Sequence, residues 1–224
     1  MSEISLLLKK TKLFADVPEE TLEKSIIPCG HFQEYRKDQF LIIPRQKVDR
    51  ISIVVSGKVH IMHLFENGQS SLMSVILPGG LVGLDLACTP SQISPYHAMA
   101  ASDAQVFYLP ASLLLNPGML EENIRIACLR RMLTLISNEN IKKEYRLAIL
   151  SQNGLRERIT AYLSMQARRR GETSFFIPFS RDEMASFLCV NRSALSHELS
   201  LMEQEGLITF RKNRFTLHNW DLNG

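Results

Sequence analysis

Residues 180–206 read SRDEMASFLCVNRSALSHELSLMEQEG, and this stretch predicts two short helices joined by a tight turn. Ser180 followed by Glu183 fits a capping box at the start of the first helix. Asn191 fits the N-cap of the second helix, and Gly206 suits the left-handed residue just past its end. We therefore expect a helix-turn-helix, the arrangement that places side chains in the major groove of DNA.

The second helix has two distinct faces at about 100° per residue. Leu195, Leu199 and Met202 share one side, which we expect to pack into a core. The opposite side is polar, and its short hydrogen-bonding groups could meet base edges, although a plain solvated surface is the alternative interpretation. The candidate DNA-contacting residues here are Ser180, Arg181, Asn191, Arg192, Ser193, Ser196, His197 and Ser200.

Residues 207–210 and 215–217 predict two strands, and the turn between them, residues 211–214, reads RKNR. A helix-turn-helix followed at once by a basic hairpin is the winged variant. Lys212 and Arg214 are candidate phosphate contacts, which fix the register of a protein on DNA without reading sequence. Solubilising the hairpin tip is the alternative role for these cations.

The composition favours a folded protein with a basic C-terminal part. The chain has 224 residues, 45% apolar and 22% charged, which is enough to bury a core. Residues 1–140 hold 13 Lys/Arg and 14 Asp/Glu, whereas residues 141–224 hold 13 and 9, so the basic excess accompanies the helix-turn-helix. No apolar run approaches the ~20 residues that span a bilayer, and the N-terminus lacks the charge order of a signal peptide. We expect a cytoplasmic protein without a membrane partner.

A helical lead-in precedes residues 32–109, where short β-rich runs alternate with turn residues. Two of these runs, 58–64 and 71–76, flank Asn67-Gly68, a strong hairpin signal. Several short strands at this spacing predict an antiparallel barrel or jelly roll, a fold that often holds one ligand.

Residues near 119–146 contain no Gly or Pro and predict one long helix. Its apolar side needs a partner, which a parallel copy from a second subunit would supply; packing on its own barrel is the alternative. The second helices of two helix-turn-helix motifs would then match a palindromic site with half-sites one helical turn apart. The candidate dimer-seam residues are Leu129, Met132, Leu133, Ile136 and Asn140.

This order of β-roll, long helix and winged helix resembles the Crp/Fnr family of bacterial transcription regulators. Residues 54–62 (VVSGKVHIM) and 67–83 (NGQSSLMSVILPGGLVG) look like the family's barrel, and residues 180–208 look like its helix-turn-helix. The resemblance covers nearly the whole chain. It implies a regulator that is not an enzyme, binds palindromic double-stranded DNA as a homodimer, and is controlled by an effector in the roll. RNA polymerase is a further candidate partner.

The expected fold class is therefore α+β, in three parts. Residues 1–117 would form the effector-sensing β-roll, a jelly roll like that of cyclic-nucleotide-binding domains, with its helical lead-in. Residues 118–146 would form the central dimerisation helix, and residues 147–224 the winged helix-turn-helix.

The resemblance places Arg192, Ser193, Ser196 and His197 at the family's DNA-reading positions. Ser193 stands where many members carry Glu, and His197 where many carry Arg, so the half-site should differ from that of the best-known members. Cys189 replaces the usual turn glycine, which implies a locally different turn.

The resemblance also argues against two known effectors. Members that bind cyclic AMP hold its phosphate on a Gly-Glu pair and an Arg-Ser pair, but here Leu84 follows Gly83 and residues 91–100 contain no Arg. The oxygen-sensing branch holds an iron–sulfur cluster on clustered N-terminal cysteines, whereas this N-terminus has only Cys29. A lone histidine such as His97 is more typical of an ordinary hydrogen-bonded residue than of a haem ligand. We expect no cofactor, and an unidentified small molecule as effector.

By analogy the effector pocket would be mostly apolar with a few polar groups, which suits an organic metabolite, although core packing is the alternative role for the same side chains. The candidate pocket residues are Leu81, Val82, Leu84, Asp85, Tyr96, His97, Met99, Leu129 and Met132.

Two other function classes stay open. In a redox-sensing regulator, Cys29, Cys88 or Cys128 would be the switch. In a cupin-like metal enzyme, histidines would ligate a metal, but His60 and His63 are three apart on a predicted strand and fall on opposite faces. Gly-rich nucleotide loops, nucleophile elbows and His-Glu-x-x-His are absent from the sequence, and we expect no metal site and no catalytic residue.

Overall fold

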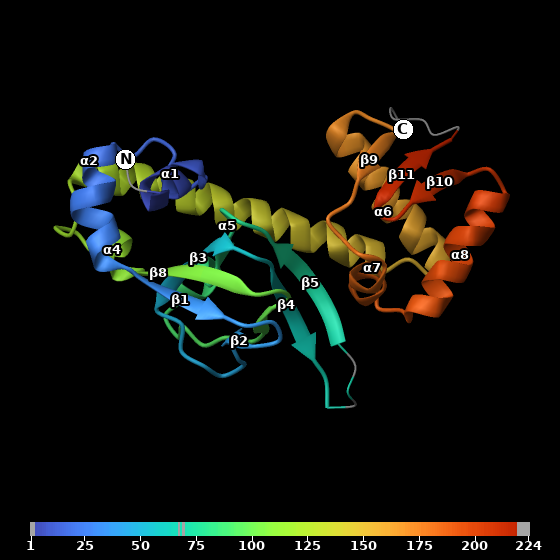
Figure 1. Ribbon diagram of the computed structural model, residues 1–224, viewed down its shortest axis with the longest axis horizontal. Helices are drawn as coiled ribbons and strands as arrows, with labels where there is room; N and C mark the ends of the chain where they lie inside the picture. Colours follow the sequence, from blue (N-terminus) through green and yellow to red (C-terminus); the bar gives the residue numbers. More distant parts are fainter. Residues whose placement is uncertain (1–2, 67, 69, 219–224) are drawn as a thin grey trace. The chain divides into compact units, whose positions relative to one another are not determined.

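A computed structural model of the chain describes residues 3–66, 68 and 70–218 (Figure 1). The first unit comprises residues 1–64 and 74–141, and the second comprises residues 65–73 and 142–224. The predicted hairpin residue Asn67 lies outside the described residues.

Two four-stranded sheets are built mainly from strands of the first unit, and the strand pairs described within them are antiparallel, as the sequence predicts. One sheet has the order β1 (His31–Tyr35), β8 (Ala104–Pro110), β3 (Arg50–Ser56) and β6 (Leu81–Val82). The other has the order β2 (Phe40–Ile42), β7 (His97–Ala100), β4 (Val59–Leu64) and β5 (Ser70–Ile76). Strand β1 was not predicted, because only Tyr35 of its five residues is buried and no alternating pattern results.

The sheets enclose one hydrophobic core, and the helices cover a second. Alternation along β3 and β8 sends Val54 and Val106 into the core between the sheets and Ile53 and Phe107 into the core beneath the helices. Both cores are almost completely shielded from water, and each large apolar side chain buried in them contributes about 1.5–3 kcal/mol. Burial of both faces makes β3 and β8 the centre of this unit.

Short helical segments surround the barrel. They are α1 (Glu3–Lys10), α2 (Glu19–Thr21), a π-helical turn at Leu22–Ile26, a 3-10 turn at Ile27–Cys29, α3 (Leu84–Ala87) and α4 (Ser112–Leu115). The long helix α5 spans Glu122–Leu150, four residues beyond its predicted end. Ile124, Cys128 and Met132, each four residues apart, pack into the helix-side core. The division between the two units falls after Ile141, within α5.

The second unit carries the predicted winged helix-turn-helix. Helices α6 (Leu155–Arg170), α7 (Arg181–Phe187) and α8 (Arg192–Gln204) combine with a three-stranded sheet of order β10 (Ile208–Arg211), β11 (Arg214–Leu217) and β9 (Ser174–Phe176). The rings of Tyr162, Phe179 and Phe187 pack together with centroids 4.9–5.8 Å apart. Strand β9 is an addition to the predicted hairpin.

Across the described ranges 3–66, 68 and 70–218, none of the helices combines the length and the apolar character needed to cross a membrane.

Candidate nucleic-acid interface

Both helices of the helix-turn-helix begin at the predicted caps. At α7, the Glu183 backbone N–H donates to Ser180 Oγ at 3.3 Å, and the Ser180 backbone N–H donates to Glu183 Oε2 at 2.6 Å. At α8, the Ala194 backbone N–H donates to Asn191 Oδ1 at 2.7 Å. Each cap is worth about 1 kcal/mol, so both helix starts are fixed by local chemistry.

The turn between the helices keeps a left-handed residue. Cys189 has φ of 57°, the region that glycine tolerates best. The expectation that Cys189 would change the turn is therefore wrong: the backbone keeps the glycine-type conformation, and only a side chain is added. Gly206, past the end of α8, has φ of 72°, as predicted.

Helix α8 separates an apolar side from a polar side. Leu195, Leu199 and Met202 are completely buried, which confirms the predicted core side. On the other side Arg192, Ser193, His197 and Ser200 are exposed, and Ser196 is half-buried. Ser193 Oγ donates to the cap at Asn191 Oδ1 (2.8 Å), and Ser200 Oγ donates to the Ser196 carbonyl (3.0 Å). The polar groups are thus presented to solvent at the start of α8, where a helix in the major groove meets base edges.

Arg192 has a partner that the sequence reasoning did not identify. Its Nη1 donates to both carboxylate oxygens of Asp182, at 3.0 and 3.3 Å. Asp182 is the second residue of α7 and Arg192 the first residue of α8, so the turn brings together side chains ten positions apart. No short periodicity signals such a pair, and only the folded helix-turn-helix reveals it.

Aromatic rings contact one arginine at the start of α7 and one in the wing. The Arg181 guanidinium lies 4.8 Å from the Phe210 ring centroid and donates to the Lys212 carbonyl at 3.4 Å. Arg214 lies over Phe176 at 5.6 Å. Such cation–π contacts keep the full charge of the guanidinium while limiting its motion.

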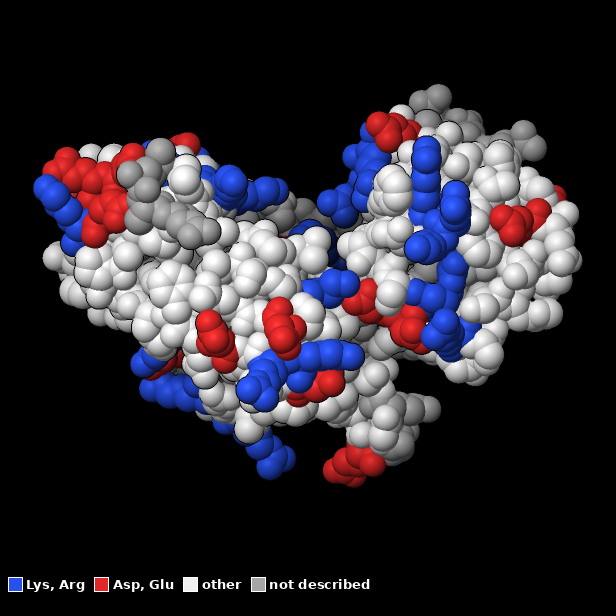
Figure 2. Space-filling view, in the orientation of Figure 1, with Lys and Arg blue, Asp and Glu red and all other residues white. Residues whose placement is uncertain are grey.

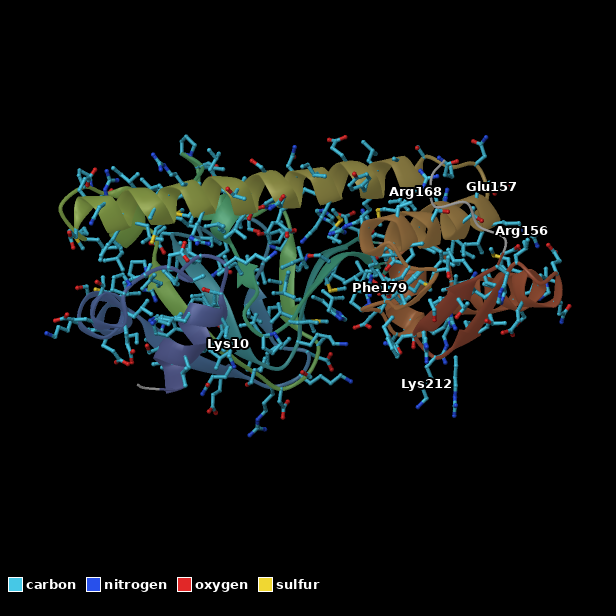
Figure 3. The ribbon with its side chains drawn as sticks, turned by 90° about the horizontal axis from the view of Figure 1, so that it is seen from above. Lys10, Arg156, Glu157, Arg168, Phe179 and Lys212 are labelled. Atoms are coloured by element: carbon cyan, nitrogen blue, oxygen red, sulfur yellow. The ribbon has the colours of Figure 1, made fainter. Side chains whose placement is uncertain are left out.

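The tip of the wing and the end of α6 extend the basic surface. Lys212 projects outward from the hairpin (Figure 3). Arg170, at the end of α6, lies over Phe175 at 5.7 Å. Figure 2 shows Lys and Arg side chains gathered in a column over the second unit, which matches the basic excess of residues 141–224. A concentrated positive surface beside an exposed polar helix face is what phosphate and base contacts together require.

On another side of α8, the helix is tied to α6. The Arg156 guanidinium donates to both carboxylate oxygens of Glu205 at 2.7 and 2.9 Å, and its Nε donates to Glu198. Figure 3 shows Arg156 near the start of α6, on the side that faces α8. These ion pairs fix the rotation and position of α8 within its unit. The sequence offered no signal for them, because the partners lie 42 and 49 positions away.

The nine candidate pocket residues divide between the two hydrophobic cores, the other face of β7 and one polar pair, and their role as an effector pocket stays a prediction. Val82 and Tyr96 pack on the core between the sheets. Ala98 and Ala100 of β7 also face this core, so the alternating residues His97 and Met99 point to the outer face. The remaining apolar members belong to the helix-side core, and they are Leu81, Leu84, Leu129 and Met132.

Asp85 and Tyr96 form the polar part of the candidate pocket. The Tyr96 hydroxyl donates to Asp85 Oδ1 at 3.0 Å, and burial, followed by the Asp85 charge, raises the pKa of Tyr96. Asp85 lies in the first turn of α3, two residues after Gly83, whose backbone is left-handed.

The candidate dimer-seam residues differ in exposure. Met132 is 2% exposed and packs into its own unit, so it is not available as a seam residue. Leu129 and Ile136 pack in part against the same core. Leu133, in contrast, is 68% exposed, and Asn140 is also exposed.

The thiols lie in surroundings that suppress the reactive thiolate at two positions. Burial raises the pKa of Cys128 to about 11. Burial, and then the charge of Asp85, raises the pKa of Cys88. Cys29 is exposed, and its Sγ donates to the Ser25 carbonyl at 3.2 Å. Within residues 3–66, 68 and 70–218, no group of three or more His, Cys, Asp or Glu side chains is placed to hold a metal ion.

Two family models match the chain, one in each part. The cyclic nucleotide-binding domain matches residues 32–116, and the Crp-like helix-turn-helix domain matches residues 157–222. The transcriptional activator protein FnrL of Cereibacter sphaeroides is 23% identical over 198 residues, which cover 84% of this chain and 76% of the relative. The anaerobic regulatory protein of Haemophilus influenzae is 26% identical over 194 residues, 84% of this chain and 72% of the relative.

Solved structures share the fold. FixK2 from Bradyrhizobium japonicum is similar with a TM-score of 0.65 and 21% identity, covering 85% of this chain and 93% of that chain. The global regulator CLP of Xanthomonas campestris, described as responsive to c-di-GMP, is similar with a TM-score of 0.68 and 16% identity, covering 91% and 100%.

Proposed function

Because this chain belongs to the Crp/Fnr family of bacterial DNA-binding transcription regulators, we propose that it acts as a homodimer whose two α8 helices read a palindromic site. The single observation that carries this proposal is the exposed polar side of α8, which begins at a capped N-terminus beside the basic wing. Arg192, Ser193, Ser196 and His197 would meet base edges in the major groove. Ser180, Arg181, Lys212 and Arg214 would contact phosphates, and the protein would work in the cytoplasm, where bacterial DNA lies.

An exposed heptad pattern on α5 supports the homodimer. Ile126, Leu133, Asn140 and Leu147 are seven residues apart, and all four are exposed in the single chain. Apolar residues at this spacing form the seam of a parallel coiled coil, and one Asn at such a position fixes register and a two-stranded state. The proposed seam therefore keeps Leu133 and Asn140 and replaces Met132, which packs inward, by Ile126 and Leu147.

We expect the effector of the barrel unit to be uncharged or cationic. The Asp85 carboxylate lies beside Gly83, at the position where cyclic-AMP-binding members hold the phosphate, and residues 91–100 supply no Arg. An anion there would lack an arginine as its ion-pair partner. Cyclic AMP at micromolar concentration should therefore not raise the melting temperature, and a clear rise would contradict this expectation. RNA polymerase is a candidate partner of the DNA-bound dimer.

Selection from a random duplex library tests the function directly. The full-length protein should enrich one palindromic sequence, whose half-site centres lie about 34 Å apart. Arg192→Ala should weaken binding of the enriched duplex by about 1–3 kcal/mol and relax base choice. Lys212→Ala should weaken enriched and scrambled duplexes alike and flatten the salt dependence. Failure to enrich any sequence, or full affinity in the Arg192 variant, would contradict the proposal.

A further inference from the structure

The ion pair between Asp182 and Arg192 lies on the surface that the proposed function turns toward DNA. Both side chains are about two-thirds exposed, at 66% and 65%. Each comes from the first turn of its helix, beside a capped N-terminus. An acidic side chain at this place is unexpected, because it repels every phosphate, in cognate and random DNA alike.

The geometry of the pair restricts how Arg192 can be used. Both hydrogen bonds to Asp182 leave from one nitrogen, Nη1. The structure gives Nε and Nη2 of Arg192 no hydrogen-bond partner among the described residues. A guanine presents O6 and N7 side by side in the major groove and accepts two N–H groups of one arginine. Arg192 can therefore stay paired with Asp182 and still offer Nε and Nη2 to a guanine.

A phosphate should bind Arg192 less favourably than a guanine edge does. It carries a negative charge, so its approach to Arg192 brings it close to the Asp182 carboxylate. Arg181 also lies near Arg192, since burial and then the charge of Arg192 lower the pKa of Arg181. The Asp182 carboxylate is the counter-ion of Arg192, and it opposes contacts that use Arg192 only as a positive charge.

We infer that Asp182 is a specificity-determining residue, which orients Arg192 toward a guanine edge and keeps it from binding phosphates of random DNA. The inference rests on the proposed function, since it requires α8 to enter the major groove. Asp182 acts through Arg192 and is a positioning residue. Asp182 raises the ratio of the affinity for cognate DNA to the affinity for random DNA, and it does not raise the affinity for DNA in general.

Four proteins and two duplexes test the inference. The proteins are the wild type, Asp182→Asn, Arg192→Ala and the double variant, and the duplexes are the selected palindrome and a scrambled sequence. Anisotropy titrations over a range of salt concentrations give both affinities. Exposed ion pairs are worth a factor of up to about five, so Asp182→Asn should bind the scrambled duplex about threefold more tightly and the palindrome about threefold more weakly. The salt slope on scrambled DNA should steepen by about 0.9, the value of one added phosphate contact.

Three controls separate orientation from charge. In the Arg192→Ala background, the Asp182 substitution should no longer change the affinity ratio, because no guanidinium is left to orient. Glu172→Gln removes an exposed carboxylate from the same unit and should leave the ratio unchanged. Asp182→Glu keeps the charge but moves it, so the ratio should fall while scrambled affinity stays near that of the wild type.

Four results are decisive against the inference. An equal change on both duplexes in Asp182→Asn would overturn it, and so would an effect that persists without Arg192. A wild type that selects a palindrome while Asp182→Asn keeps its full ratio would overturn this inference alone. A wild type that binds all duplexes equally would overturn the proposed function as well.

Discussion

Asn191 caps α8 and lies at the end of α8 that is proposed to meet DNA. Two substitutions of Asn191 separate its effect on helix stability from its effect on DNA affinity. Its Oδ1 accepts the Ala194 backbone N–H at 2.7 Å and the Ser193 hydroxyl at 2.8 Å. Asn191→Ala removes this acceptor and should destabilise the first turn of α8 by about 1 kcal/mol. Asn191→Asp keeps the acceptor and adds a negative charge at the positive end of the helix, which should stabilise the turn by about 0.3–1 kcal/mol.

The same charge should act against DNA. A carboxylate about 4 Å from a phosphate in water costs about 1 kcal/mol, so Asn191→Asp should raise the Kd for DNA about fivefold. Asn191→Ala should raise it less, because the frayed turn can reform on binding. Stability and affinity should therefore move in opposite directions in the Asp variant and in the same direction in the Ala variant.

Amide hydrogen exchange at Ala194 and anisotropy titrations measure the two quantities in one set of proteins. A loss of about 1 kcal/mol corresponds to about fivefold faster exchange at Ala194 in Asn191→Ala, and exchange in Asn191→Asp should be as slow as in the wild type or slower. Asn191→Ser, which restores a capping oxygen without charge, is the matched control and should behave like the wild type in both assays. Faster exchange in the Asp variant would refute the cap, and unchanged DNA affinity in that variant would refute the placement of this helix end beside phosphates.

Three further outcomes are expected. Arg156→Ala should release α8 from α6 and raise the Kd for the selected palindrome several-fold in an anisotropy titration. Arg156→Lys cannot make the bidentate pair with Glu205, so it should recover only part of the lost DNA affinity. Leu133→Asp should give a monomer in sedimentation, and its melting temperature should be normal because the Leu133 side chain is 68% exposed in the single chain. If this variant still sediments as a dimer, the seam lies elsewhere. Cys128, whose pKa burial raises to about 11, should resist alkylation below pH 9, and its protonated form contributes stability that falls as the pH rises from about 9 to about 11. Rapid labelling of Cys128 itself at pH 8, located by peptide mass spectrometry, would contradict its burial.

Local chemistry made the helix-turn-helix predictable. The caps at Ser180 and Asn191 act within three residues, and the three buried side chains of α8 repeat at helical spacing. The barrel strands were predictable for a related reason, since the two faces of a strand alternate. The weakly patterned β1, in which only Tyr35 is buried, escaped notice.

Contacts between distant residues were not predictable in this way. The Arg192 pair with Asp182 and the Arg156 pairs with α8 depend on how the helices cross, which no short pattern records. The effector pocket was predicted on a different basis. Its residues were placed by analogy, and strand alternation sends His97 to the outer face of β7 while its neighbour Ala98 faces the core.

Half-site spacing tests most directly whether two α8 helices read DNA together. The selected palindrome is compared with one in which about five base pairs, half a helical turn, are inserted between its half-sites. Paired α8 helices should bind the lengthened duplex at least ~10-fold more weakly, because its second half-site faces the opposite side of the DNA. Equal affinity for the two duplexes would contradict recognition by a symmetric dimer.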